Sequence, residues 1–130
     1  MKKVCTVVWT VCFAFLLCFA CAAAETDVLA EAIADCMGKE PFVVRVAFGE
    51  LLLNRVDSAA FPDTVDEVAL DFADGHIRDA SESDYRAAAS AERRFGFAGG
   101  ALYVKKWKEV ENTPLEMRSG VRLYDWFFYI

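Results

Sequence analysis

The apolar positions of the chain change their spacing along it, from helical in the N-terminal part to strand-like near the C-terminus. Between residues 25 and 37, apolar side chains recur every three or four residues on one face: Val28, Leu29, Ala32, Ile33 and Cys36. This spacing predicts a first helix. Acidic residues at positions 25 and 27 suit its N-terminal end, and Gly38 suits its C-terminal end.

A second predicted helix follows at once. Pro41 suits a helix start, where its missing N–H costs nothing, and the segment Phe42–Val56 is apolar on almost every side. A helix of that composition lies at the centre of a fold. Its polar exceptions include Glu50 and Asn54, which are four residues apart and therefore share a face.

The remaining pattern predicts two shorter helices and two strands. Thr64–Glu67 matches a capping box that starts a short helix, residues 73–76 read as a turn, and a further helix spans residues 83–95. Residues 99–107 and 121–130 are rich in aromatic and β-branched residues, which predicts two strands of a small antiparallel sheet. Helices followed by strands indicate the α+β class.

Residues 1–24 have the composition of a secretory signal peptide. Lys2 and Lys3 come first, an apolar run extends to Cys21, and three alanines supply a cleavage site. We therefore expect a signal peptide over residues 1–24, one domain over residues 25–130, and a secreted or cell-envelope location without stable membrane insertion. An uncleaved N-terminal anchor stays open as an alternative, because the apolar run is near the lower limit for a membrane span.

The charge of the chain argues against two kinds of partner. Removing residues 1–24 removes Lys2 and Lys3 from the 14 basic residues and none of the 20 acidic ones, so the remainder has a formal net charge of −8. Such a chain is a poor electrostatic partner for nucleic acid or for an anionic membrane surface.

Cysteine and histidine usage narrows the chemistry further. Four of the five cysteines lie within residues 1–24, so Cys36 alone remains and no intramolecular disulfide can form. His76 is the sole histidine, which excludes a zinc site of the usual kind, and nothing in the sequence calls for another metal or a cofactor.

Several short motifs stand in a fixed order between residues 29 and 65 and again towards the C-terminus. This order resembles that of the bacterial cell-wall hydrolases of the spore cortex-lytic type, which carry L-A-x-x-I-x-x-E-A-R-G-E-P, then a helix ending in L-N-R-V, then F-P-x-T-V. The matching residues, in register without a gap, are Leu29, Ala30, Ile33, Glu40, Pro41, Val46, Ala47, Leu53, Asn54, Arg55, Val56, Phe61, Pro62, Thr64 and Val65. Later segments are similar to the family's D-G-R-I, Y-R-A-A, G-G-A-L-Y and F-Y: Asp74–Ile77, Tyr85–Ala88, Gly99–Tyr103 and Phe128–Tyr129.

The resemblance implies a lysozyme-related α+β fold, in which N-terminal helices pack with a small antiparallel sheet beside a groove for peptidoglycan glycan strands. It also implies cleavage between N-acetylmuramic acid and N-acetylglucosamine, by hydrolysis or by lytic transglycosylation, with one glutamate as general acid. Such an acid is needed because the leaving oxygen must take up a proton as the glycosidic bond breaks.

Residue 36 departs from the family pattern at the position of that acid. In the ungapped register the first Glu of E-A-R-G-E falls on Cys36 and the second on Glu40. A thiol, with an ordinary pKa of about 8.5, donates a proton poorly at neutral pH and supplies no carboxylate. The segment between Val65 and Asp74 is also shorter than in the family, and the family's Y-E-G-Q and N-H-V-F-Y motifs have lost an acid and a histidine.

Three residues therefore compete for a catalytic role. Cys36 can be a buried inert thiol, the remnant of a lost acid, or a nucleophile whose sole available base is His76. Glu40 can stabilise the start of the second helix or take over as acid. Glu50 interrupts a buried helix and can be a hydrogen-bonded structural carboxyl or a substitute acid.

Tyr103, Asp74 and Trp126 are the candidates for the walls of a substrate groove, although aromatic residues in strands also serve as core. Tyr103 and Trp107 fall on one side of the first predicted strand. Asp35 points away from the apolar face of the first helix, and we expect it to be solvated.

Two functions remain open. The chain is either a secreted cell-wall hydrolase-family protein that cleaves glycan strands, or a catalytically inactive peptidoglycan-binding module that has lost the general acid. A thiol-dependent enzyme is a third class. The residue at position 36 separates the first two classes and favours the second.

Overall fold

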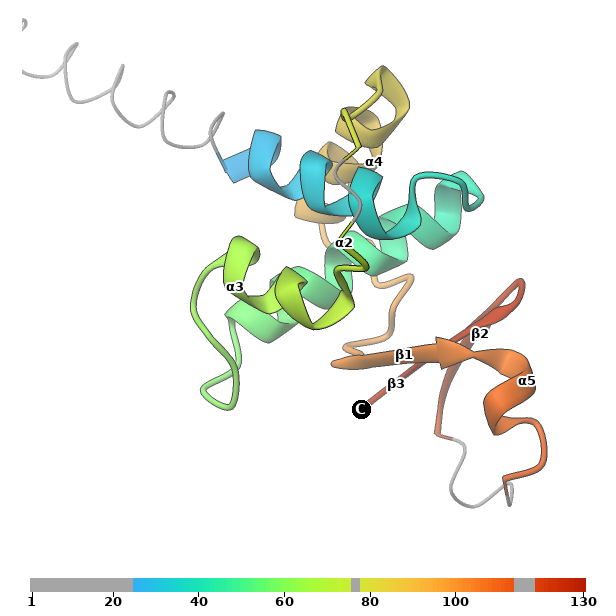
Figure 1. Ribbon diagram of the computed structural model, residues 1–130. Helices are drawn as coiled ribbons and strands as arrows, with labels where there is room; N and C mark the ends of the chain where they lie inside the picture. Colours follow the sequence, from blue (N-terminus) through green and yellow to red (C-terminus); the bar gives the residue numbers. More distant parts are fainter. Residues whose placement is uncertain (1–24, 76–77, 114–118) are drawn as a thin grey trace, which may run out of the picture.

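The computed structural model describes residues 25–75, 78–113 and 119–130. Residues 25–37 are helical and are followed by α2 (Phe42–Val56), α3 (Val65–Ala69), the 3-10 turn η1 (Leu70–Phe72) and α4 (Glu82–Glu92). The C-terminal part contains β1 (Tyr103–Lys106), α5 (Trp107–Val110), β2 (Gly120–Leu123) and β3 (Trp126–Tyr129). The helices that precede β1 form one body, and the sheet lies along one side of it with α5 at the sheet's end, as the predicted α+β class requires (Figure 1).

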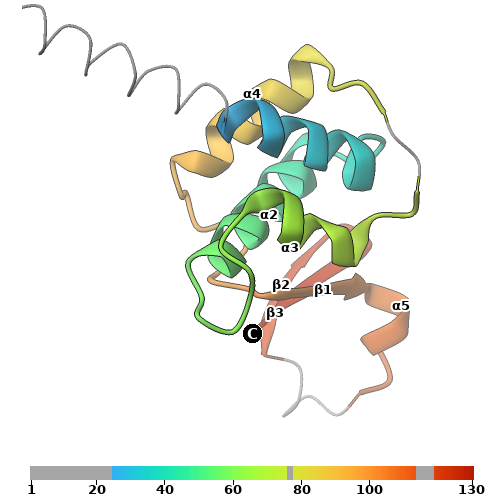
Figure 2. The same cartoon turned by 60° about the vertical axis from the view of Figure 1, so that its left-hand side comes forward.

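The α2 helix lies at the centre of the helical body, as predicted from its composition (Figure 2). Gly49 marks the point where α2 meets both the first helix and α4. A Cβ atom at this position would lie 2.7 Å from the Cβ of Ala91 and 3.0 Å from the Cδ1 of Ile33. The close approach of the three helices therefore depends on the absence of a side chain at Gly49.

The helix boundaries follow local capping chemistry. The Thr64 hydroxyl accepts a hydrogen bond from the Glu67 amide and starts α3, as predicted. Ser81 and Asp84 form a full capping box at the start of α4, which ends at Glu92 rather than near Phe95. Pro41 precedes α2 as its N-cap rather than forming its first residue.

The sheet has three antiparallel strands in the order β1-β3-β2, so the prediction of two strands was wrong. The segment 121–130, expected to be one strand, contains most of β2 and all of β3, joined by a tight turn at Tyr124 and Asp125. Tyr124 has a φ of 55°, a left-handed conformation that glycine or asparagine usually marks in a sequence. Trp107, expected in the first strand, begins α5.

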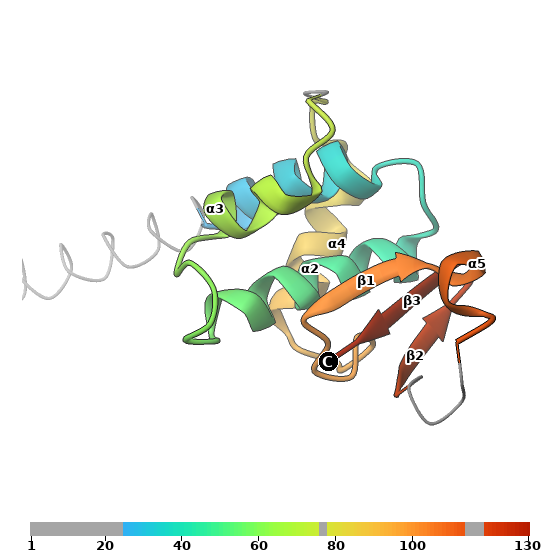
Figure 3. The same cartoon turned by 60° about the horizontal axis from the view of Figure 1, so that its bottom comes forward.

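The two faces of the sheet have different environments. Phe128 is fully buried, and Val104, Leu123 and Trp126 pack beside it against the helical core. The opposite face carries Tyr103, Lys105, Arg122, Phe127 and Tyr129. Figure 3 shows β1 as the strand that runs beside α2.

The predicted signal peptide and His76 lie outside the described residues. Within the described part of the chain, no helix has the length and apolar character needed to cross a membrane.

Candidate functional site

Cys36 lies in the last turn of the first helix and is half-buried. Burial raises the pKa of its thiol, and the nearby carboxylates of Asp35 and Asp74 raise it further, to about 11. The Arg78 guanidinium opposes this shift without cancelling it. The thiol is therefore neutral at physiological pH.

Arg78 is hydrogen-bonded to Asp35 at the C-terminal end of this helix. The Arg78 amide donates a hydrogen bond of 2.6 Å to Oδ1 of Asp35, and the Arg78 guanidinium donates to the Asp35 carbonyl oxygen. Arg78 also lies 3.8 Å from a carboxylate oxygen of Asp74. The expectation that Asp35 is solvated was wrong, because it holds the segment that brings Asp74 and Arg78 to Cys36.

Glu40 lies in the turn between the first helix and α2, where it faces the sheet. Its Oε1 is 3.7 Å from Nζ of Lys106, at the end of β1. The same ammonium group lies 3.9 Å from the ring centroid of Trp126. Nε1 of Trp126 is buried without a hydrogen-bond partner among the described residues. Glu40 and Trp126 are therefore joined through Lys106.

Tyr103 lies at the other end of β1, about 10 Å from Lys106 at the usual rise of a strand. Its ring stacks on Tyr129 at 5.4 Å and meets the edge of Phe61 at 6.0 Å, while 42% of the residue stays exposed. The β1 strand thus runs from an aromatic cluster at Tyr103 to a charged cluster at Glu40.

The carboxylate of Glu50 contacts a different part of the fold from Cys36, Glu40 and Tyr103. It is 2% exposed, and its two carboxylate oxygens accept hydrogen bonds from the amides of Gly96 at 3.0 Å and Ala98 at 2.9 Å. Both oxygens therefore have protein partners, and the carboxylate holds the turn that follows α4. These contacts favour the structural alternative for Glu50.

Two further polar residues of α2, Asn54 and Arg55, connect the helical body to the sheet, a role that was not predicted from the sequence. Nε of Arg55 donates to the carbonyl of Leu102 at 2.7 Å, and Nδ2 of Asn54 donates to that of Ala101 at 3.1 Å. The Arg55 guanidinium also lies 4.5 Å from the ring centroids of both Phe61 and Phe72. Their position as polar residues in an apolar helix was the signal that could have identified them.

The described residues contain no group of three or more His, Cys, Asp or Glu residues able to hold a metal ion.

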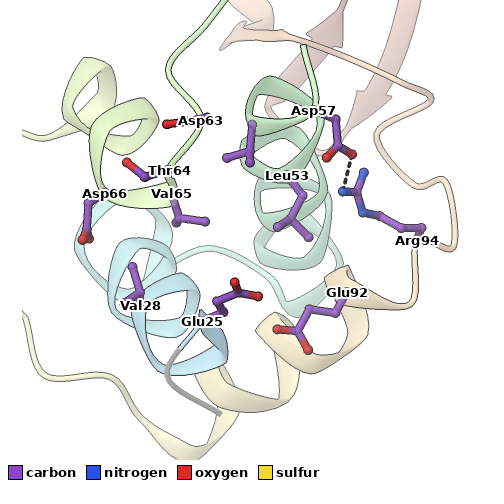
Figure 4. Close-up of a pocket in the computed structure, with 11 residues that line it drawn as sticks. Glu25, Val28, Leu53, Asp57, Asp63, Thr64, Val65, Asp66, Glu92 and Arg94 are labelled. Atoms are coloured by element: carbon purple, nitrogen blue, oxygen red, sulfur yellow. Dashed lines mark hydrogen bonds and ion pairs between the residues drawn. The ribbon is translucent and has the colours of Figure 1, made fainter. Parts of the chain in front are cut away.

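Two cavities open elsewhere on the molecule. One of about 590 Å³ lies between α2, α3 and the ends of the first helix and α4 (Figure 4), and one of about 260 Å³ lies beside Phe42 and Phe97. Neither is lined by Cys36, Glu40 or Tyr103, and the expected concavity at those residues stays a prediction.

Comparison with known proteins finds similarity at the level of structure. No protein-family model matches the chain, and no curated protein gives a significant match. The catalytic domain of the germination-specific lytic transglycosylase SleB from Bacillus anthracis superposes with a TM-score of 0.65 at 26% identity, over 82% of this chain and 93% of that domain. The catalytic domain of SleB from Bacillus cereus superposes with a TM-score of 0.64 at 23% identity, over 82% of this chain and 89% of that domain. The chain therefore has the peptidoglycan-hydrolase-like fold of the SleB catalytic domains, and the predicted resemblance to the spore cortex-lytic enzymes is confirmed.

Proposed function

We propose that this protein is a secreted peptidoglycan-binding module, derived from glycan-cleaving enzymes, that no longer has their general acid. The observation that carries the proposal is the thiol at position 36. It stands where the motif alignment places the catalytic glutamate, and burial and neighbouring carboxylates raise the pKa of Cys36 to about 11.

The chemistry of the thiol supports this proposal. A general acid works best when its pKa is close to the working pH, because it must hold a proton and still release it in the transition state. A carboxyl group in an apolar and acidic environment meets this condition, whereas a thiol in the same environment has a pKa far above it. Among the described residues, the charged neighbours Asp35 and Asp74 suppress the ionisation of Cys36, whereas a nucleophile needs a group that promotes it.

The contacts of the other acids support a structural role for them. Glu50 holds two backbone amides, and Asp35 holds the amide of Arg78. Glu40 is the remaining alternative, since it is half-buried at the same helix junction and its carboxylate lies 3.7 Å from Nζ of Lys106. Its neighbour Lys106 offers an ion pair, which is a structural role for this carboxylate.

Glycan binding needs contact surfaces rather than an acid, and candidates for these surfaces lie on the sheet and near Cys36. Tyr103 is exposed and already stacked on Tyr129, so a sugar ring can extend the stack. Asp74 is exposed near Cys36, where its carboxylate can accept hydrogen bonds from sugar hydroxyl groups. Trp126 would contribute as part of the wall under Lys106.

The direct test is to incubate the purified protein with peptidoglycan and to measure both released reducing or anhydro-sugar ends and the protein retained on the insoluble wall. We expect retention without release, and the same result for Cys36→Ser. Robust release that survives Cys36→Ser and is lost in Glu40→Gln would contradict the proposal and identify Glu40 as the acid. Absence of both retention and release would contradict glycan binding itself.

Restoring the acid tests the same proposal from the other side. In Cys36→Glu the new carboxyl group would share the burial and the acidic neighbours of the thiol, which raise a carboxyl pKa. General acid catalysis contributes on the order of 10²–10⁴-fold, so a partial gain is measurable above background. Because three other family features have changed, we expect a gain at the lower end of that range.

The matched control is Cys36→Gln, because the glutamine side chain has the size of glutamate but no acidic proton. Equal release by the Glu and Gln variants, in folded protein, would show that the loss of the acid is not what silences the site. The shortened segment between Val65 and Asp74 would then account for the missing activity through poor substrate positioning.

A further inference from the structure

The larger cavity is an open cleft with an apolar floor. Its walls come from the N-terminal end of the first helix, the C-terminal end of α2, the segment leading into α3, and the end of α4 (Figure 4). Val28, Leu53, Val56 and Val65 supply the apolar surface. Its volume of about 590 Å³ is within the range of ligand sites, roughly 300–1,000 Å³.

The rim of this cleft is acidic. Five carboxylates surround the opening: Glu25, Asp57, Asp63, Asp66 and Glu92. The one cationic lining residue is Arg94, which is already engaged by Asp57 at 2.7 Å and by Oδ1 of Asn54 at 2.8 Å. The five acidic and one basic side chains that line the cleft among the described residues sum to a formal charge of −4.

Two of these carboxylates are available to a partner. Asp63 and Asp66 are exposed on either side of Thr64, and neither makes a hydrogen bond or ion pair with another residue in the described ranges. Their mutual repulsion and that of their neighbours is relieved by any cation that binds between them.

The cleft is distinct from the proposed glycan site. Glu25 and Cys36 lie at opposite ends of the first helix, about 16 Å apart at the rise of an α-helix. A glycan strand with carboxylate groups has the wrong charge for an acidic rim, so a different ligand is required.

We propose that this cleft binds a short basic segment of a partner protein, which inserts an apolar side chain between Leu53 and Val65 and places lysine or arginine side chains on the rim. A single small amine would reach only part of the rim, because the carboxylates stand around the whole opening (Figure 4). Several cations spaced along one peptide reach more of them. A second copy of this chain is a poor occupant, because its net charge is also negative.

The test uses three synthetic peptides as probes: Lys-Leu-Lys-Leu-Lys, Lys-Ser-Lys-Ser-Lys and Glu-Leu-Glu-Leu-Glu. Binding is followed through the backbone amide signals of the purified protein in NMR titrations. We expect the first peptide to bind and to shift the amides of Val56 and Val65, the second to bind clearly more weakly, and the third not to bind. Raising the salt from about 0.02 M to about 0.3 M should weaken binding, because rim charges are screened.

The variant Asp63→Asn/Asp66→Asn removes two charges from the rim and should weaken the first peptide roughly fivefold or more. The control Glu31→Gln/Glu109→Gln removes two exposed charges that do not line the cleft and should leave binding unchanged. If the rim variant unfolds, the salt series and the peptide comparison on the unchanged protein decide alone.

Three results would overturn the proposal. Equal binding of the leucine and serine peptides would show that the apolar floor is unused. Equal weakening by the rim and control variants would show attraction to net charge only. Sedimentation that reveals dimers whose formation protects the cleft would make a second copy the occupant.

Discussion

The surroundings of Cys36 suppress ionisation of whatever acid stands there. Burial, Asp35 and Asp74 all stabilise the protonated form, and Arg78 offsets only part of their effect. For a carboxyl group this environment would raise the pKa towards neutral, which suits a proton donor. For a thiol the same environment removes reactivity. These surroundings would therefore suit a carboxylic acid at position 36 as a proton donor better than they suit the thiol.

The reactivity of the thiol gives a prediction at the scale of this residue. Because the pKa of Cys36 is raised from 9.0 to about 11, we expect alkylation by iodoacetamide at pH 8 to be about 100-fold slower than for an ordinary thiol, since only the thiolate reacts. The rate should rise with pH to a midpoint near 11.

The same protein unfolded in urea is the matched control, because its thiol has no environment to raise the pKa. Equal alkylation rates in the folded and unfolded protein would show that Cys36 is not held neutral. The shift also has a cost at high pH. Because the thiol ionises at a lower pH in the unfolded chain, the folded protein loses stability as the pH rises from 9.0 to about 11.

At the scale of elements, α2 holds the later segments of the chain through its polar side chains. Arg45 reaches Asp84 and Ser83 at the start of α4, Glu50 holds the turn after α4, and Asn54 and Arg55 hold the backbone that leads into β1. The polar exceptions to the apolar pattern of α2 thus fix three parts of the fold: the start of α4, the turn after it and the segment before β1.

These contacts also show how far sequence patterns reach. The composition of residues 42–56 predicts α2 as the central helix, and the sequence shows Glu50 and Asn54 as polar exceptions on one face of it. Their hydrogen-bond partners lie 46 to 48 positions later in the chain, where no local rule can connect them. The hairpin of β2 and β3 was missed for a local reason, because its turn at Tyr124 and Asp125 contains no glycine or asparagine.

The packing of α2 gives the prediction at this scale. Gly49→Ala would place a methyl group 2.7 Å from the Cβ of Ala91, closer than carbon atoms can approach. Helix propensity alone favours alanine over glycine by about 1 kcal/mol. Overpacking costs roughly 1–3 kcal/mol, and the propensity gain offsets part of this cost. We therefore expect a net loss of about 1 kcal/mol in the free energy of unfolding.

Urea denaturation measures this loss. The control Ala89→Leu adds bulk at an exposed position of α4 with little change in helix propensity and should stay within about 0.5 kcal/mol of the unchanged protein. A Gly49→Ala variant that is as stable as the unchanged protein, or more so, would show that the three helices can separate without loss of packing.

At the scale of the whole molecule, charge is distributed unevenly between the helical body and the sheet. Residues 25–100 contain 16 acidic and 7 basic side chains, a net charge of −9, whereas residues 101–130 contain 4 acidic and 5 basic ones, a net charge of +1. The two proposed binding surfaces follow this division. The acidic cleft belongs to the helical body, and Tyr103 with its neighbouring lysines belongs to the sheet.

The Arg45–Asp84 pair makes the stability of the whole molecule depend on pH. Both side chains are largely buried, and Nη1 of Arg45 lies 2.7 Å from Oδ1 of Asp84. Burial alone would raise the pKa of Asp84, but hydrogen bonds from Ser81 and the charge of Arg45 outweigh it and hold the pKa below 3.8. The pair therefore contributes stability at pH values above 3.8, and this contribution is lost as the pH falls through the lowered pKa.

We expect Asp84→Asn to lower the free energy of unfolding at pH 7 by about 3 kcal/mol, because it leaves the Arg45 charge buried without a counter-charge. The decrease in stability between about pH 5 and pH 2 should be shallower in this variant, since Asp84 no longer takes up a proton. Thermal unfolding across that range measures both effects. The control is Glu82→Gln, two residues before Asp84 on α4. Because the ion pair between Glu82 and Arg86 is exposed, this substitution should change the free energy of unfolding by less than about 1 kcal/mol. Parallel pH profiles for the unchanged protein and Asp84→Asn would show that acid sensitivity originates in other carboxylates, and the buried pair would then serve only to position α4.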